Sequence, residues 1–349
     1  MDLSRLVFPV LHRLDPERAH DLTIWGLKHG FGPVQRGPED AILRCSLWNL
    51  DFPNPIGISA GFDKNAEVFD PLLRAGFGFV EVGTVTPWPQ AGNAKPRLFR
   101  LREDGALINR MGFNNDGLDR VLARLSNRHG GIVGVNMGAN KESADTIRDY
   151  ASAASRVAPL ADYMVANVSS PNTPGLRILH NRDKLEVLIE RVQTAARDSV
   201  VSPPPFLVKI APDLTEEDER DIADIALATG IDGLIVSNST IHRPNSLLSA
   251  CCTEPGGLTG RPLFDPSTQI LRRMYERTEG RIPLIGVGGV ASGDDAYRKI
   301  RAGASLVQLY TALIYQGPEL LYRIVRDLAD RLRADGFESV SAAVGADYQ

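Results

Sequence analysis

Asparagine side chains recur where short apolar segments of this chain end. The set comprises Asn109, Asn115, Asn136, Asn167, Asn172 and Asn238. A neutral amide presents N–H donors and a C=O acceptor in one plane, so several amides together suit a flat ligand whose edge carries the same groups, such as a pyrimidine or a flavin ring. A single asparagine is better explained as a turn residue or a helix cap. The set as a whole therefore favours a ligand site.

Lys209 lies inside the apolar run Phe206-Leu207-Val208-Lys209-Ile210. A buried ammonium group without a partner is unfavourable, so an anionic group is expected to face it. One candidate is Glu81, the main acidic residue within the other apolar runs. The other is a reduced flavin, which carries negative charge near N1 and is tuned by a cation placed there. We favour the flavin, and Glu81 stays open as the alternative.

Glycines cluster near the end of the apolar run at residues 283–290, in Gly286-Val287-Gly288-Gly289, and Gly303 precedes the next run, at residues 306–312. Backbone N–H groups at such a turn bind a phosphate dianion. The spacing differs from the G-x-G-x-x-G pattern of dinucleotide sites, which disfavours a Rossmann fold. A mononucleotide phosphate, such as that of FMN, fits better. Glycines that serve only tight turns are the alternative.

The apolar runs predict the elements that position these residues. The runs are almost continuously hydrophobic, which is typical of strands covered on both faces in a parallel sheet. Eight of them cover residues 54–61, 79–86, 132–139, 163–170, 206–212, 233–239, 283–290 and 306–312. Helical segments with charged faces lie between them, for example at 116–129, 144–158, 183–200 and 216–229. We therefore predict an α/β fold, a (β/α)8 TIM barrel with its site at the C-terminal strand ends. An open doubly wound sheet would gather its ligand residues at one switch point.

Three further segments lie outside the barrel repeat. Residues 1–36 carry apolar side chains at helical spacing on both sides of Asp15-Pro16, which predicts an N-terminal amphipathic helical hairpin. Such a hairpin either contacts a membrane and covers an apolar tunnel, or caps the bottom of the barrel. Residues 87–111 form an insertion longer than a simple loop needs. We expect the barrel at 37–336 and a loose polar tail at 337–349.

Composition narrows the class of protein. The 349 residues carry a net charge of −4, which argues against a dedicated nucleic-acid binder. No apolar run is long enough for a membrane span. Cys45, Cys251 and Cys252 form no CxxC motif and no disulfide framework, so a reducing compartment and no metal site are expected. No signal peptide is evident at the N-terminus.

Longer motifs resemble the dihydroorotate dehydrogenases of the quinone-dependent class 2. The motifs are DPERAH (15–20), AGFDKN (60–65), NRMGFNN (109–115), VNMGANK (135–141), NVSSPNTPGLR (167–177), GGLTGRP (256–262), IGVGGV (285–290) and LVQLYTALIY (306–315). The resemblance spans almost the whole chain. It implies that FMN accepts a hydride from C6 of dihydroorotate while a base removes a proton from C5. Ubiquinone or menaquinone then reoxidises the flavin, and orotate enters pyrimidine synthesis.

The resemblance also implies roles for individual residues. Ser170 matches the base of class 2; class 1 enzymes have a cysteine there, and none of the three cysteines occupies this position. From its sequence surroundings alone Ser170 would be an ordinary loop serine, but Thr173 and Phe113 match positions linked to proton relay from it. The implied substrate contacts are Lys64, Asn109, Arg110, Met111, Gly112, Phe113, Asn167, Asn172, Asn238 and Ser239.

The FMN contacts implied by the resemblance come from every part of the barrel. They are Ala60, Gly61, Phe62, Asp63, Lys64, Thr84, Asn136, Asn167, Lys209, Ser237, Gly260, Gly289, Tyr310 and Thr311. Ser237 and Ser239 stand where threonine is common in the family, and Thr259 stands where serine is common. Each of the three keeps a hydroxyl group. His20, Arg100 and Tyr310 are matched to a quinone tunnel beneath the N-terminal hairpin.

A peripheral location on the cytoplasmic face of a bacterial inner membrane is expected, because the N-terminus lacks an Arg- and Ser-rich presequence. A processed mitochondrial form is the alternative. Other readings of the function are a class 1 enzyme that uses fumarate or NAD, and a barrel that binds a flavin without turnover. A further alternative concerns only residues 1–36, which would form a hairpin that docks onto another protein. No nucleic-acid partner is expected.

Overall fold

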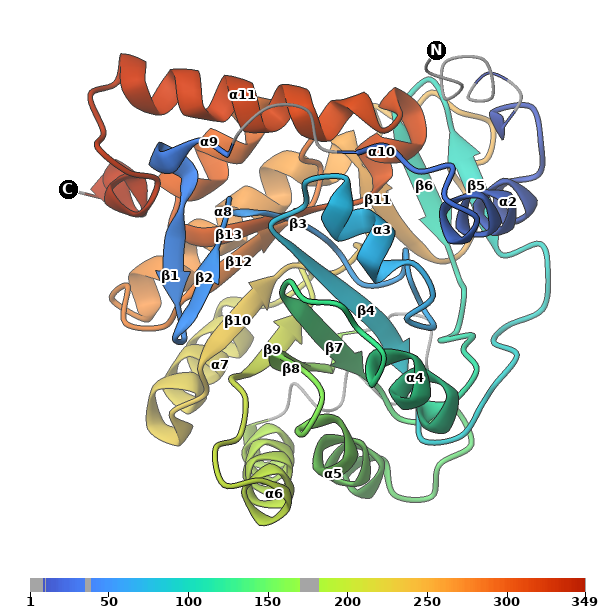
Figure 1. Cartoon of the computed structure of the whole chain (residues 1–349), viewed down its shortest axis with the longest axis vertical. Helices are drawn as coiled ribbons and strands as arrows, with labels where there is room; N and C mark the ends of the chain where they lie inside the picture. Colours follow the sequence, from blue (N-terminus) through green and yellow to red (C-terminus); the bar gives the residue numbers. More distant parts are fainter. Residues whose placement is uncertain (1–8, 10, 35–38, 170–181, 349) are drawn as a thin grey trace.

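A computed structural model of the chain describes residue 9 and residues 11–34, 39–169 and 182–348. Its centre is a closed barrel of eight parallel strands, in the spatial order β10-β12-β13-β3-β4-β7-β8-β9 (Figure 1). The strands are β3 (Ile56–Ile58), β4 (Phe79–Val85), β7 (Val133–Met137), β8 (Tyr163–Asn167), β9 (Phe206–Ile210), β10 (Gly233–Val236), β12 (Leu284–Val287) and β13 (Ala304–Leu309). Each overlaps one of the eight runs predicted from hydrophobicity. The (β/α)8 prediction is confirmed.

Helices follow the strands and surround the barrel (Figure 1). They are α3 (Phe69–Arg74), α4 (Leu118–Leu125), α5 (Thr146–Val157), α6 (Arg182–Ser199), α7 (Glu216–Thr229), α8 (Phe264–Arg277), α9 (Gly293–Arg301), α10 (Thr311–Gln316) and α11 (Glu319–Ala334). The ends of α7 show how local sequence sets these bounds. Thr215 and Asp218 form a reciprocal capping box, and Gly230 ends the helix in the left-handed conformation, at φ 64°.

Aromatic rings fill the barrel interior where glycines leave room for them. A Cβ atom on Gly57 would lie 2.4 Å from the Phe79 ring, and one on Gly134 would lie 2.0 Å from the Tyr163 ring. The two rings meet edge to face, with centroids 6.3 Å apart. Interiors are packed at crystal-like density, so these glycines are required by the neighbouring aromatic side chains rather than by backbone conformation.

A β-hairpin closes the N-terminal end of the barrel. It consists of β1 (Cys45–Leu47) and β2 (Leu50–Phe52), preceded by a 3₁₀ turn, η1 (Ala41–Leu43). Phe52 packs on Phe79, and the indole N–H of Trp48 donates to the Asp232 carbonyl at 2.8 Å. Capping the bottom of the barrel is one of the roles considered above for residues 1–36. This hairpin performs that role instead.

A three-stranded antiparallel sheet covers part of the opposite end. Its order is β11-β6-β5, with β5 (Leu98–Leu101), β6 (Ala106–Asn109) and β11 (Gly257–Gly260). The predicted insertion supplies β5 and β6, and a short 3₁₀ turn, η3 (Arg261–Leu263), follows β11. Helix α2 (Pro16–Lys28) lies beside β5 (Figure 1). It is the second of the two predicted N-terminal helices; most of the first lies outside the described residues.

The C-terminal segment is not the loose tail that its polar sequence suggested. Val340 and Ala343 are buried, and the Val340 N–H donates to the Ile42 carbonyl at 2.8 Å. Asp347 forms ion pairs with Arg272 and Arg301. The 3₁₀ turns η4 (Ser341–Ala343) and η5 (Ala346–Tyr348) therefore lie against the barrel. The small apolar residues among the polar ones provide this contact.

Candidate active site

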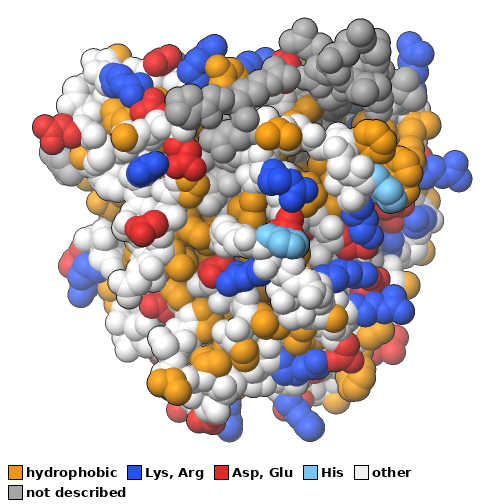
Figure 2. Space-filling view, viewed as in Figure 1, with side chains coloured by type: hydrophobic (Ala, Val, Ile, Leu, Met, Phe, Trp, Pro, Cys, Tyr) orange, Lys and Arg blue, Asp and Glu red, His pale blue; other side chains and the backbone are white. Residues whose placement is uncertain are grey.

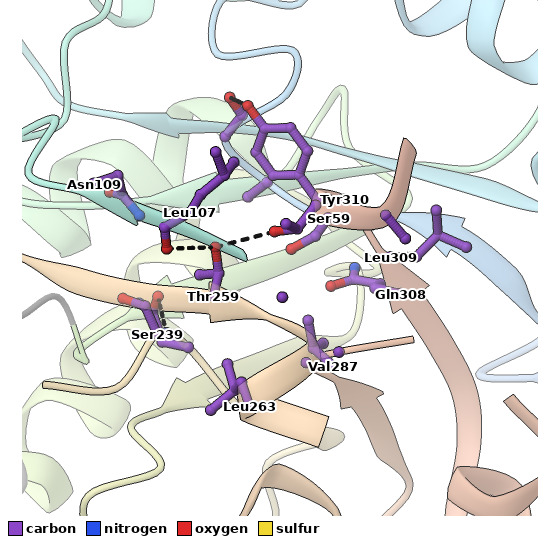
Figure 3. Close-up of a pocket in the computed structure, with 18 of the residues that line it drawn as sticks. Ser59, Leu107, Asn109, Ser239, Thr259, Leu263, Val287, Gln308, Leu309 and Tyr310 are labelled. Atoms are coloured by element: carbon purple, nitrogen blue, oxygen red, sulfur yellow. Dashed lines mark hydrogen bonds between the residues drawn. The ribbon is translucent and has the colours of Figure 1, made fainter. Parts of the chain in front are cut away.

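A cavity of about 370 Å³ opens at the C-terminal ends of the barrel strands (Figure 3). This volume lies in the range typical of sites for small ligands and cofactors. The predicted residues that line it are Ala60, Gly61, Lys64, Thr84, Asn109, Met111, Gly112, Phe113, Asn167, Lys209, Ser237, Asn238, Ser239, Gly260, Gly289, Tyr310 and Thr311. His20, expected in the quinone tunnel, lines the same cavity. Ser170, Asn172 and Thr173 lie outside the described residues.

The floor of the cavity is a buried polar network around the Glu81 carboxylate. Its oxygens accept hydrogen bonds from Asn136 Nδ2 at 2.8 Å and from Gln308 Nε2 at 2.6 Å. Lys209 Nζ lies 3.5 Å from Glu81 Oε1 and donates to Ser59 Oγ at 3.1 Å. The alternative partner of Lys209 is therefore present in the structure, while Lys209 still lines the cavity. Asn136 lies in this network beneath the cavity and does not line it.

A chain of hydrogen bonds connects the cavity wall to this floor. Asn238 Nδ2 donates to Asn167 Oδ1 at 3.2 Å, and Asn167 Nδ2 donates to Thr84 Oγ1 at 3.1 Å. Thr84 Oγ1 in turn donates to Asn136 Oδ1 at 2.6 Å. Each amide is thereby held in one orientation, because its donor and acceptor ends have different partners. The wall presents a fixed pattern of donors and acceptors to a ligand.

Asp63 and Phe62 shape the cavity from behind its lining. The Asp63 carboxylate accepts the backbone N–H groups of Glu67 at 2.7 Å and Val68 at 2.8 Å, which holds the loop that carries Lys64. Burial raises the pKa of Asp63 to about 6, against the opposing effect of these hydrogen bonds. The Phe62 ring meets Tyr310 edge to face, with centroids 5.6 Å apart. Both residues were expected to contact a cofactor, and the structure places them one layer outside the cavity.

Lys64 faces His20 across the cavity wall, with Nζ 3.4 Å from Nε2. Burial lowers the pKa of Lys64 to about 8, although the carboxylates of Glu17 and Asp21 oppose the change. Burial, followed by repulsion from Lys64, also holds the pKa of His20 well below its usual value. At neutral pH the imidazole is therefore neutral and the lysine is cationic. The ammonium is available to an anion in the cavity.

An ion pair missed by the sequence reasoning fixes helix α2 beside the cavity. Arg97 Nη2 lies 2.7 Å from Glu17 Oε1, and both side chains are almost fully buried. Arg97 Nη1 also donates to the carbonyls of Ala91 and Asn93, so the pair ties α2 to the insertion. Glu17 is part of the DPERAH motif, but the motif alone does not reveal its partner, which lies 80 residues away.

Two glycines after β12 line the cavity with backbone alone. Gly288 and Gly289 have φ values of 111° and 74°, and a Cβ atom on Gly289 would lie within 2.6 Å of Phe264. Both positions therefore require glycine. Gly303, which was grouped with them, lies at the N-terminal end of β13, against the Tyr275 ring. Because the cavity is at the other end of the barrel, Gly303 is not part of it and serves a turn.

Other lining residues escaped the sequence reasoning because nothing in the local sequence marks them, whether they come from the small sheet, from η3, from α10, from loops or from within strands. They are Ser59, Leu98, Gly105, Leu107, Asn114, Thr259, Arg261, Leu263, Val287, Val290, Ala291, Gln308, Leu309, Ala312, Tyr315 and Gln316, some of them drawn in Figure 3. Of these residues, Thr259 appears in the sequence analysis only as a departure from the common family residue, not as an expected contact. Leu98 and Leu107 form an apolar part of the wall, and they belong to neighbouring strands of the insertion.

Comparison with known proteins adds to this geometry. The family model described as dihydroorotate dehydrogenase matches residues 42–332. The chain belongs to the dihydroorotate dehydrogenase family. The protein of Rhodospirillum rubrum named dihydroorotate dehydrogenase (quinone) is 56% identical over 351 positions, covering 100% of this chain and 95% of the relative. The mitochondrial dihydroorotate dehydrogenase (quinone) of Oryza sativa subsp. japonica is 52% identical, covering 99% of this chain and 80% of the relative.

Solved structures in the family have the same fold. A crystal structure of DHODH from Eimeria tenella in complex with ferulenol matches with a TM-score of 0.94 and 44% sequence identity, over 98% of this chain and 99% of that one. A ligand-free structure from the same organism matches with a TM-score of 0.92. Together with the curated relatives, these matches confirm the resemblance to the quinone-dependent class of the family.

Two arginines expected in the site are occupied by other contacts. The Arg110 guanidinium pairs with Glu254 at 2.8 Å and lies over the Phe99 ring, and its side chain does not line the cavity. Arg100 Nη1 donates to the Leu14 carbonyl at 2.7 Å, which ties the chain before α2 to strand β5. Arg100 therefore lies where the N-terminal segment meets the sheet, next to the cavity but outside its lining.

Few buried side-chain atoms of the described residues lack a hydrogen-bond partner. They are Arg100 Nε, Asn114 Oδ1 and Gln308 Oε1. Unsatisfied buried polar atoms are rare in folded proteins, so each calls for an explanation. Asn114 and Gln308 both line the cavity. Their free acceptors indicate that the cavity is built to receive N–H or O–H donors of a ligand.

Proposed function

We propose that this protein oxidises dihydroorotate to orotate in pyrimidine biosynthesis, with FMN as the hydride acceptor and a membrane quinone as the final electron acceptor. Family membership supports the reaction. The observation that carries the site assignment is the chain from Asn238 through Asn167 and Thr84 to the floor of the cavity. It presents oriented amides to a planar, amide-edged ligand.

The residues of the cavity fit FMN. The free acceptor of Gln308 suits an N–H of the flavin ring, and Lys209 provides a cation at the floor. Gly288, Gly289 and Gly260 leave room for a phosphate group close to the backbone. When bound, FMN supplies the hydride acceptor for the reaction. The contacts expected at Ala60, Gly61, Thr84, Ser237, Tyr310 and Thr311 belong to the same proposal, and Phe62, Asp63 and Asn136, which lie outside the lining, would act through their neighbours.

Lys64, Asn109, Asn167 and Asn238 are proposed to hold the substrate. The Lys64 ammonium would bind the carboxylate of dihydroorotate by charge-assisted hydrogen bonds. The amides would orient the pyrimidine ring through its N–H and C=O groups. Ser170 is proposed as the base that removes the C5 proton, on the strength of the motif. Ser169, the preceding residue, is fully buried and its Oγ donates to Asn167 Oδ1 at 3.0 Å.

Helix α2 supports the proposed quinone and membrane contacts. Apolar side chains on and after it are largely exposed: Leu22 by 49%, Trp25 by 54%, Phe31 by 68% and Val34 by 69%. Figure 2 shows hydrophobic side chains beside lysine and arginine side chains in this region. This combination suits the surface of a membrane. None of the described helices has the length and apolar character needed to cross a bilayer.

We therefore propose that the protein is peripheral, on the cytoplasmic face of a bacterial inner membrane. Ubiquinone or menaquinone would reach the cavity beneath α2, where His20 and Tyr310 line it together with the apolar side chains of Leu98 and Leu107. Removal of residues 1–36 distinguishes this role from a protein-docking hairpin. The shortened protein should lose quinone reduction in detergent while dihydroorotate still reduces its flavin.

The decisive experiment is anaerobic bleaching of the visible spectrum of the purified protein by dihydroorotate. The flavin absorbance should bleach and then recover on addition of a soluble quinone, but not of fumarate. Recovery with fumarate or NAD alone would move the protein to class 1. A flavin that does not bleach would favour a binding protein without turnover. Ser170→Ala should bleach far more slowly than the unaltered protein while it retains the flavin spectrum.

A further inference from the structure

Lys299 is a fully buried lysine that the proposed reaction leaves without a role. It lies on α9, and its side chain has no exposed surface. Among the described residues no carboxylate forms an ion pair with it. Burial lowers the pKa of its ammonium to about 7, and the Arg298 charge lowers it further, while the carboxylates of Asp295 and Asp265 oppose the change. An ammonium group kept in such a place is costly, and a methionine would fill the same space without that cost.

The contacts of Lys299 lead to the turn at Gly288 and Gly289, which lines the cavity. Its Nζ donates to Ser267 Oγ at 2.9 Å and to Thr268 Oγ1 at 3.1 Å, both on α8. The side chain passes next to Gly286, where an added Cβ atom would lie 3.1 Å from Lys299 Cδ. Lys299 therefore lies directly behind the backbone segment that ends in Gly288 and Gly289.

Ser267 connects the ammonium group to this turn. Its hydroxyl accepts from Lys299 and donates toward two carbonyls, that of Phe264 at 3.0 Å and that of Gly288 at 3.2 Å. The Gly288 carbonyl belongs to the same peptide group as the Gly289 N–H. Gly289 lines the cavity, and the described part of the chain offers its N–H no acceptor.

A hydrogen bond to a carbonyl strengthens the N–H of the same peptide as a donor, because hydrogen bonds in a chain polarise one another. The order here is ammonium, hydroxyl, peptide carbonyl and peptide N–H. Positive charge at the buried end therefore increases the partial positive charge that the N–H presents to the cavity. An anion bound there would in turn favour the charged form of the lysine.

We propose that Lys299 is a positioning residue which, through Ser267, polarises the Gly288–Gly289 peptide to bind the phosphate group of the flavin mononucleotide. The inference rests on the proposed function, since it assumes that the cavity takes FMN. It assigns to α8 and α9 a part in cofactor retention that neither lining residues nor motifs reveal.

The test compares two flavins that differ only in the phosphate. Full-length protein freed of flavin is titrated with FMN and with riboflavin, and binding is followed by the loss of flavin fluorescence. Lys299→Met should weaken FMN binding roughly tenfold, which is the scale of one hydrogen bond to a charged group. Riboflavin binding should change less than twofold. An equal loss for both flavins would reduce Lys299 to a packing role and overturn the proposal.

Matched variants keep the comparison decisive. Ile300→Val alters a fully buried neighbour on the same helix, and it should leave the ratio of FMN to riboflavin affinity unchanged. Ser267→Ala removes the connecting hydroxyl and keeps the lysine, so it should weaken the binding of FMN but not that of riboflavin. It replaces Lys299→Met in the test if that variant does not fold. An unaltered protein that binds neither flavin would contradict the proposed function itself.

A second measurement does not depend on riboflavin affinity. In the FMN-loaded protein, the ³¹P resonance of the bound phosphate reports the electrostatic field at that group. It should shift in Lys299→Met and in Ser267→Ala and stay in place in Ile300→Val. An unshifted resonance in both of the first two variants would overturn the proposal.

Discussion

The floor of the cavity and its α2 side both bury charged groups, but different parts of the chain hold them. At the floor, Glu81, Lys209 and Gln308 come from three strands of one closed barrel, and each is held by a hydrogen bond or an ion pair to a residue of another strand. On the α2 side, Glu17 comes from a helix outside the barrel and reaches Arg97 on the insertion. The geometry of the floor is set by the sheet, whereas that of the α2 side depends on the docking of one helix.

This difference separates two requirements of the proposed reaction. The flavin and the substrate need fixed donors and acceptors, and the closed barrel provides them. A quinone must enter from a membrane, and α2 lies outside the barrel with apolar side chains exposed. Changes at the floor should therefore affect folding and the whole reaction. Changes on the α2 side should affect mainly the quinone step, and the substrate step only through the effect of Glu17 and Asp21 on Lys64.

The largest effect is expected for Glu81→Leu. Removal of one partner of a buried ion pair leaves Lys209 unpaired and should lower the free energy of unfolding by about 3–5 kcal/mol. Urea denaturation followed by circular dichroism measures this loss. The double variant Glu81→Leu/Lys209→Met removes both charges and should recover most of the stability. A single variant as stable as the unaltered protein would contradict the role given to the floor.

A smaller and local effect is expected for Glu17→Leu. Arg97 keeps its hydrogen bonds to the Ala91 and Asn93 carbonyls, so the loss in unfolding free energy should be about 1–3 kcal/mol, the cost of one unsatisfied buried group. The KM for quinone should rise. At pH 6, where Lys64 stays cationic even without the Glu17 carboxylate that raises its pKa, bleaching of the flavin by dihydroorotate should stay normal. Steady-state and anaerobic kinetics separate the two. Slower bleaching would show that α2 also supports the substrate half of the site.

The pKa of Lys64, lowered by burial to about 8, predicts a pH effect on orotate binding. Below pH 8 the lysine is cationic and binds the carboxylate. Above it the free protein loses this proton, so affinity should fall about tenfold for each pH unit. Spectral titration of the bound flavin with orotate between pH 7 and 9 measures the slope. Lys64→Arg, which stays protonated throughout, should bind with little change over the same range.

The smallest effect is expected for Trp25→Ala on the exposed face of α2. Loss of part of its apolar contact area should reduce binding to lipid vesicles about threefold. Sedimentation with vesicles measures the bound fraction, and bleaching by dihydroorotate should not change. The matched variant Trp88→Ala removes an exposed tryptophan from the insertion instead and should leave vesicle binding intact. Equal losses in both would indicate unspecific adsorption.

Several features followed from the sequence because they depend on neighbouring residues. A run of apolar residues that is buried on both faces signals a parallel strand wherever it lies, and all eight barrel strands were predicted in this way. The capping of α7 by Thr215 and Gly230 is equally local. The family could be named because its motifs are contiguous, and the conclusion did not need the arrangement of these motifs in space.

Only the tertiary structure decided which residues meet across long separations in the chain. Strand β6 pairs with β11, so Asn109 lies opposite Gly257, and the two halves of this sheet are far apart in the sequence. Lys209 on β9 lines the expected cavity and also reaches the alternative partner, Glu81 on β4, because side chains of strands that are not adjacent meet inside a closed barrel. Gly303 was assigned to the wrong end of the barrel, since a glycine turn has the same signature at either end. The sequence by itself thus determined the barrel elements and the family. The closing of the barrel and the docking of α2 decided which side chains contact one another, because burial and charge act through space rather than along the chain.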